Sequence, residues 1–81
     1  MKAAVLEESG RVVYRDVPDP IMDDYSALLR VESVAICGSD LRIIKTGNPR
    51  VKPPAIIGHE TSGVVVAAGK HVTRVKVGDR V

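Results

Sequence analysis

The chain has 81 residues, with 12 Lys and Arg against 10 Asp and Glu and a formal charge of +2. These charges are too few and too dispersed for a nucleic-acid-binding surface, which excludes that class of protein. One cysteine excludes an intrachain disulfide framework, and the first residues lack the long apolar stretch of a signal peptide or membrane span, so we expect no membrane contact and a cytoplasmic location.

The first elements are predicted to form a β-hairpin. Residues 3–6 and 11–15 are short runs of strand-forming residues separated by Glu8-Ser9-Gly10, a turn-forming sequence. Pro18 and Pro20 then stop strand pairing, because proline has no amide hydrogen to donate.

A longer strand is predicted next, from Ala27 to Ile36. Its odd positions are mostly apolar, whereas Arg30 and Glu32 on the opposite parity are charged. This period of two indicates a half-buried strand, and the strand delivers Cys37 at its end.

A short helix of about two turns is predicted over residues 39–45, with Ser39 as the capping residue. Residues 48–54 contain three prolines, directly follow Gly47 and indicate a loop, and residues 61–68 form a valine-rich strand. Residues 72–81 alternate apolar and polar residues around Gly78-Asp79, a tight-turn signal. The chain ends as this last run starts a new strand, so we expect it to be part of a longer polypeptide.

Two motifs place metal-binding side chains in the middle of the chain. Cys37-Gly38-Ser39-Asp40 and Gly58-His59-Glu60 together supply a thiol, an imidazole and a carboxylate, which are the ligands zinc accepts. A catalytic zinc keeps one position open for water or substrate.

Each of these side chains also has a purely structural interpretation. Cys37 could be a small buried residue, His59 a structural histidine and Glu60 a solvated charge, while Ser39 and Asp40 could cap the helix. The glycine and polar residues around Cys37 and His59 favour a site over a core.

The second histidine is interpreted differently. His71 lies in the polar sequence Gly69-Lys70-His71-Val72-Thr73, so we expect it at the surface.

Three segments in order resemble the zinc-dependent medium-chain dehydrogenase family: residues 36–41, 53–63 and 75–81. The resemblance covers residues 1–81 and implies a mainly β, partly open barrel of the chaperonin-10-like (GroES-like) fold, truncated, with a short helix after Cys37. It implies that residues 1–81 are the N-terminal portion of a catalytic domain and that the Rossmann nucleotide-binding domain lies outside this chain.

The resemblance also implies the activity and the roles of the motif residues. The full-length protein would oxidise an alcohol or polyol with Zn²⁺ and NAD or NADP, and would be a homo-oligomer in the cytoplasm. Cys37 and His59 would be zinc ligands, and Glu60 a further ligand in polyol-type members. Ser39 would hydrogen-bond the substrate oxygen and pass on its proton, and Asp40 would hold the other ring nitrogen of His59.

Two positions depart from many members of the family. Arg42 stands where a histidine often ends the proton relay, and an arginine cannot carry a proton. Gly38 replaces a basic residue and is more typical of polyol, butanediol and threonine dehydrogenase-like members, which favours a polyol or secondary alcohol as substrate.

Two other functions stay open: a non-enzymatic GroES-like β-barrel module, and a zinc-free quinone or enoyl reductase of the same superfamily. The third zinc ligand, a structural zinc and the choice of NAD or NADP cannot be read from these residues, and no cofactor-binding residue is assigned.

Overall fold

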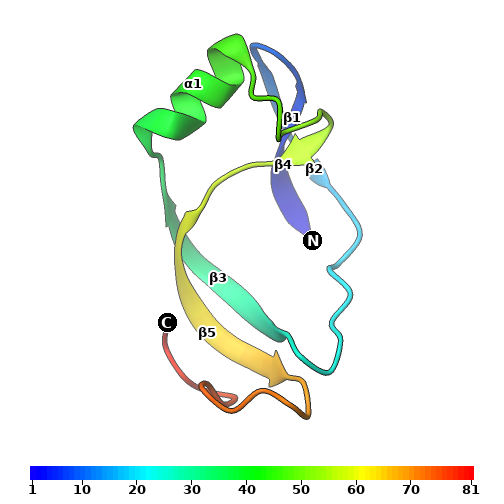
Figure 1. Ribbon diagram of the computed structural model, residues 1–81, viewed down its shortest axis with the longest axis vertical. Helices are drawn as coiled ribbons and strands as arrows, with labels where there is room; N and C mark the ends of the chain where they lie inside the picture. The colour runs from blue at the N-terminus through cyan, green and yellow to red at the C-terminus, as the bar shows by residue number, and fades with distance from the viewer. The chain divides into compact units, whose positions relative to one another are not determined.

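The computed structural model describes all 81 residues. The chain is mainly β with one short helix after Cys37, as predicted, and neither sheet is closed. The helix has nine residues, and the chain contains no helix with the length and apolarity that crossing a bilayer requires. In chain order the elements are β1 (Lys2–Glu8), β2 (Arg11–Asp16), β3 (Ala27–Ala35), α1 (Gly38–Thr46), β4 (Ala55–Ile56) and β5 (Glu60–Ala68) (Figure 1).

The chain divides into two compact units, the first made of residues 1–18 and 35–60. This unit contains a three-stranded antiparallel sheet in the order β2-β1-β4. The predicted hairpin is confirmed, with Ala4 opposite Tyr14 and β4 paired to the other edge of β1. Val5 and Leu6 of β1 are 2% and 1% exposed, and burying each side chain stabilises the unit by about 1.5–3 kcal/mol.

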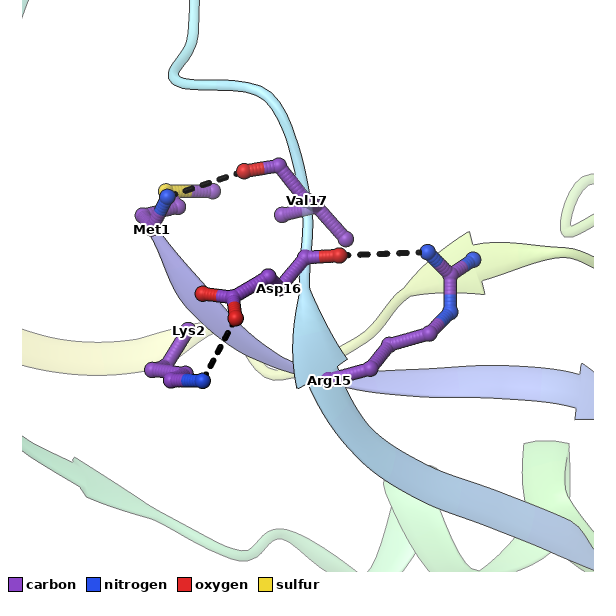
Figure 2. Close-up of polar contacts among 5 residues, drawn as sticks. All are labelled: Met1, Lys2, Arg15, Asp16 and Val17. Atoms are coloured by element: carbon purple, nitrogen blue, oxygen red, sulfur yellow. Dashed lines mark hydrogen bonds and ion pairs between the residues drawn. The ribbon is translucent and has the colours of Figure 1, made fainter.

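The open end of the hairpin is held by polar contacts (Figure 2). The Lys2 ammonium lies 2.6 Å from the Asp16 carboxylate, and the Met1 ammonium donates to the Val17 carbonyl at 2.8 Å. Arg15 also donates to the Asp16 carbonyl at 3.5 Å. These groups are exposed, so each contact contributes at most about 1 kcal/mol.

Helix α1 begins one residue earlier than predicted, because Cys37 rather than Ser39 occupies the N-cap position. The Asp40 carboxylate accepts a hydrogen bond from the Cys37 amide at 3.0 Å, which satisfies one of the amides left free at a helix start. At the other end of the helix, the Gly10 amide donates to the Ile44 carbonyl at 2.6 Å. The hairpin turn thus caps the helix that carries the first motif.

The second unit consists of residues 19–34 and 61–81, and its sheet pairs β3 with β5. Gly63 and Val81 exchange two backbone hydrogen bonds, at 2.9 and 3.0 Å, so the last residues pair with β5. A Cβ atom at Gly63 would overlap the backbone of Arg30, which explains why this position of β5 is glycine.

Two predictions for the second unit are wrong in part. β3 has the predicted limits to within one residue, but it is not half-buried on its odd parity, since Val31 is 56% exposed and Ala35 is exposed. Residues 72–81 do turn at Gly78-Asp79, where the Asp79 amide donates to the Lys76 carbonyl. The residues after the turn hydrogen-bond to β5, but their pairing is an isolated bridge of Arg80 with Val64 and not a full strand. Periodicity identifies the apolar face of a strand, but it does not determine whether another segment covers that face.

Candidate metal centre

The two motifs meet within the first unit because each lies where a strand gives way to another element. Cys37 follows the end of β3 and precedes the first residue of α1, and His59 directly precedes β5, which begins at Glu60. Gly58, directly before His59, has a φ of 112°, a backbone conformation that residues with a Cβ atom rarely adopt. This glycine therefore sets the direction in which the chain presents His59.

The side chains of Cys37, His59 and Glu60 each offer one donor atom, and these atoms lie within 4.8 Å of one another. Zinc bonds to sulfur, nitrogen and oxygen are about 2.0–2.3 Å long, which puts tetrahedral ligands about 3.3–3.8 Å apart. The three donors therefore need to approach by at most about 1–1.5 Å to share one ion. A thiolate, an imidazole and a carboxylate are also the donor types that zinc prefers, so the residues fit this metal.

Ser39 places its hydroxyl group between two of these donors. Its Oγ lies 3.4 Å from the Cys37 sulfur, to which it donates, and 3.5 Å from Nε2 of His59. The serine hydroxyl thus faces the space in which the donor atoms converge.

Asp40 contacts both motifs with one carboxylate. It is 4% exposed, its Oδ1 lies 3.3 Å from Nδ1 of His59, and its Oδ2 accepts the bond from the Cys37 amide. A carboxylate beside Nδ1 favours a proton on that nitrogen, which leaves the lone pair of Nε2 directed to a metal. The contact with His59 was predicted, whereas the bond to the Cys37 amide was not.

Electrostatics prepares the cysteine for metal binding. The Ser39 hydroxyl, its backbone amide and then His59 lower the pKa of the Cys37 thiol below its ordinary value. The Cys37 sulfur, followed by Asp40, raises the pKa of His59. A thiolate is the form that ligates metals, so the lowered pKa of Cys37 favours metal binding, whereas the raised pKa of His59 opposes it.

The remaining candidates, Arg42 and His71, make other contacts. Arg42 is exposed on α1, and its carbonyl accepts a hydrogen bond from the Thr46 hydroxyl. His71 is exposed in the second unit, as predicted, and its ring stacks on Tyr25 with centroids 4.8 Å apart.

Known proteins resemble this chain in both sequence and fold. Residues 23–81 match the family model described as the alcohol dehydrogenase GroES-like domain. The chain is 41% identical to the D-xylulose reductase of Morganella morganii, with 100% of the chain and 25% of that protein aligned, and 43% identical to sorbitol dehydrogenase 1 of Saccharomyces cerevisiae, with 98% and 23% aligned. Among solved structures, the zinc-dependent alcohol dehydrogenase 2 of Streptococcus pneumonia superimposes with a TM-score of 0.90 at 36% identity, covering 99% of this chain and 23% of that chain.

The chain spans about a quarter of the length of these relatives. The family model covers most of the chain, and the superposition confirms the GroES-like fold. The chain therefore belongs to the zinc-type medium-chain alcohol and polyol dehydrogenase family, in which it matches the N-terminal GroES-like domain.

Proposed function

We propose that this chain supplies the catalytic zinc centre of a nicotinamide-linked dehydrogenase that oxidises a secondary alcohol or polyol. The observation that carries the proposal is the convergence of Cys37, His59 and Glu60 donor atoms within 4.8 Å. Zinc, when bound, supplies a Lewis acid for a substrate oxygen. Cys37 and His59 are the proposed ligands, and Glu60 is the third donor that this chain offers.

Ser39 is the proposed group that handles the substrate proton. Its hydroxyl lies beside both ligands, where it can accept a hydrogen bond from a substrate hydroxyl and move that proton outward. The proton does not continue to Arg42, because a guanidinium group stays protonated and has no free lone pair to accept it. We infer that the relay passes from Ser39 to water or to the cofactor.

Asp40 acts on the ligands and not on the substrate in this proposal. Its carboxylate holds Nδ1 of His59 and the Cys37 amide, so it fixes the orientation of one ligand ring and the backbone of the other ligand.

A polyol is the favoured substrate class. The family resemblance implies that Gly38 is typical of polyol-type members, and relatives aligned over nearly the whole chain include a D-xylulose reductase and a sorbitol dehydrogenase. We place the nucleotide-binding domain and the NAD or NADP site outside residues 1–81. A cytoplasmic location and a homo-oligomeric full-length protein belong to the same proposal.

Zinc binding to the chain tests the proposal. Isothermal titration with Zn²⁺, and mass-spectrometric measurement of bound zinc, should give one ion per chain. Cys37→Ser should abolish binding, because a serine hydroxyl at neutral pH is a poor replacement for a thiolate ligand. Unchanged stoichiometry and affinity in Cys37→Ser would show that the metal lies elsewhere.

His71→Gln is the matched control, since it removes the histidine of the second unit and should leave zinc binding intact. In the full-length enzyme, zinc removal should stop alcohol oxidation. A metal-free enzyme that still reduces quinones would support the zinc-free reductase instead.

A further inference from the structure

Four cationic side chains lie between the two metal-binding motifs. The segment between Asp40 and Glu60 contains Arg42, Lys45, Arg50 and Lys52 and no acidic residue. The segment follows the motif that carries Cys37 and ends at His59, and the donor atoms of these two residues converge within 4.8 Å. Positive charge is therefore concentrated in the one stretch of chain that starts and ends at the proposed metal centre.

The acidic side chains of the same unit are engaged elsewhere. Those of the β1–β2 hairpin each lie within 4.0 Å of a hairpin cation, in the pairs Lys2–Asp16, Arg15–Glu7 and Arg11–Glu8. The other two acids of the unit, Asp40 and Glu60, belong to the metal centre. The hairpin charges thus balance one another, whereas the charges between the motifs do not.

Arg42 is the neighbour of Ser39 on one face of α1. Residues three apart in a helix lie on the same side, about 4.5 Å apart along the axis, and their Cα–Cβ bonds tilt toward the N-terminus. The Ser39 hydroxyl lies 3.4 Å from the Cys37 sulfur and 3.5 Å from Nε2 of His59, so Arg42 tilts toward the metal centre. Lys45 is three residues further along the same side.

This position on α1 borders the path of a substrate. A catalytic zinc keeps one coordination position for water or substrate, and the Ser39 hydroxyl faces the space where the donor atoms converge. A substrate bound there extends past Ser39, and the next side chain on that side of the helix is Arg42. This follows from the helix and the metal centre alone, whichever residues outside 1–81 surround them.

The chemistry of these side chains selects an anion. Arginine always carries its charge and presents a planar fork of N–H donors that matches two oxygens of a phosphate. A phosphate monoester carries a charge of about −1.5 to −2 at neutral pH, more than a carboxylate, and several cations in one segment suit this larger charge. A neutral polyol has no group that takes up the charge.

We propose that the substrate of this site is a phosphorylated polyol. Its reacting hydroxyl lies at the metal centre beside Ser39, and its phosphate group binds the guanidinium of Arg42, while Lys45, Arg50 and Lys52 add positive charge around the phosphate. This assignment rests on the proposed function, because it names the substrate class of the same zinc site. Arg42 is then a residue that determines substrate specificity, and no proton passes through it.

Steady-state kinetics of the full-length, zinc-loaded enzyme test the proposal. Pentitols and hexitols are compared with their terminal monophosphates, each with NAD and with NADP. The monophosphates should have a kcat/KM at least about tenfold higher, and added salt should reduce this preference because it screens exposed charges. Arg42→Gln should reduce the preference at least about tenfold, mainly through the KM of the monophosphates.

Two control variants separate phosphate binding from a structural role. Arg42→Lys keeps the charge but loses the fork, so it should retain part of the preference. Both changes at this position leave the hydrogen bond from Thr46 in place, since Thr46 donates to the backbone carbonyl of Arg42. Arg74→Gln removes a cation from the second unit and should keep the full preference.

The possible failures are distinct. Equal kcat/KM values for phosphorylated and neutral polyols, or equal losses on both in Arg42→Gln, would overturn the phosphate assignment and leave the proposed function standing. A higher KM for NAD or NADP in Arg42→Gln, with the KM of the monophosphates unchanged, would assign the cation to a cofactor phosphate and also overturn it. A zinc-loaded enzyme that oxidises neither kind of polyol would overturn the proposed function and this assignment together.

Discussion

Asp40→Asn tests whether one carboxylate positions both proposed zinc ligands. The Asp40 carboxylate accepts from the Cys37 amide through Oδ2 at 3.0 Å and lies 3.3 Å from Nδ1 of His59 through Oδ1. Asparagine has a single acceptor oxygen, so it can keep one of these two contacts and must turn its NH₂ group, which only donates, toward the other partner.

The size of the effect follows from the burial of the site. Asp40 is 4% exposed, so water has little access to replace the lost acceptor. Loss of a group that orients a metal-binding histidine typically lowers metal affinity about 10–100-fold. We expect zinc binding to weaken within this range while the stoichiometry stays the same.

The assay is a competition titration of Zn²⁺ against a chromophoric chelator, with far-ultraviolet circular dichroism to confirm the fold. Asp79→Asn is a matched control, because Oδ2 of Asp79 also accepts from a backbone amide three residues earlier, that of Lys76, at 3.0 Å and touches no proposed ligand. A zinc affinity of Asp40→Asn within twofold of the wild type would refute the positioning role.

Three further predictions concern pH and packing. Ser39→Ala should raise the pKa of Cys37 and weaken zinc binding near neutral pH. The difference in zinc affinity between variant and wild type should disappear at alkaline pH, where the thiol ionises in both proteins, and a difference that stays constant across pH would contradict this prediction. Arg80 and then Arg30 lower the pKa of Glu32, so the ionised Glu32 stabilises the fold above its unfolded pKa of about 4.3, and this stabilisation is lost as pH falls through its folded pKa. Glu32→Gln should therefore reduce the fall of the thermal unfolding midpoint at acid pH, and an unchanged fall would argue against this role of Glu32. Gly63→Ala should destabilise the chain by about 1–3 kcal/mol, measured by urea unfolding, since its Cβ meets the Arg30 backbone, whereas the same change at Gly38, where a Cβ meets nothing within 4 Å, should not.

The sequence predicted most elements because their signals are local. The hairpin follows from two runs of strand-forming residues around Glu8-Ser9-Gly10, and β5 follows from a valine-rich run that ends at a glycine. The helix was placed to within one residue, and its N-cap was wrong because Asp40 bonds back to the Cys37 amide and draws Cys37 into the capping position.

The candidate site depended on motifs more than on periodicity. That Cys37 and His59 approach each other was expected from the family resemblance, and the donor distances agree with that expectation. The second bond of Asp40 and the positive φ of Gly58 depend on how the chain turns between distant segments. A signal for Gly58 was present, since a glycine directly before a candidate ligand indicates an unusual backbone conformation.

The small core gives the proposed zinc a structural role in addition to a chemical one. The fully buried apolar side chains are few, namely those of Val5, Leu6 and Val65, and a chain of this size has little other burial to offset its conformational entropy. A metal held by Cys37 and His59 would tie together the two ends of the intervening loop in the folded chain. Because a formed site is rare in an unfolded chain, the free energy of zinc binding adds to the free energy of folding. The same ion would therefore both activate a substrate oxygen and hold together the two segments that form its site.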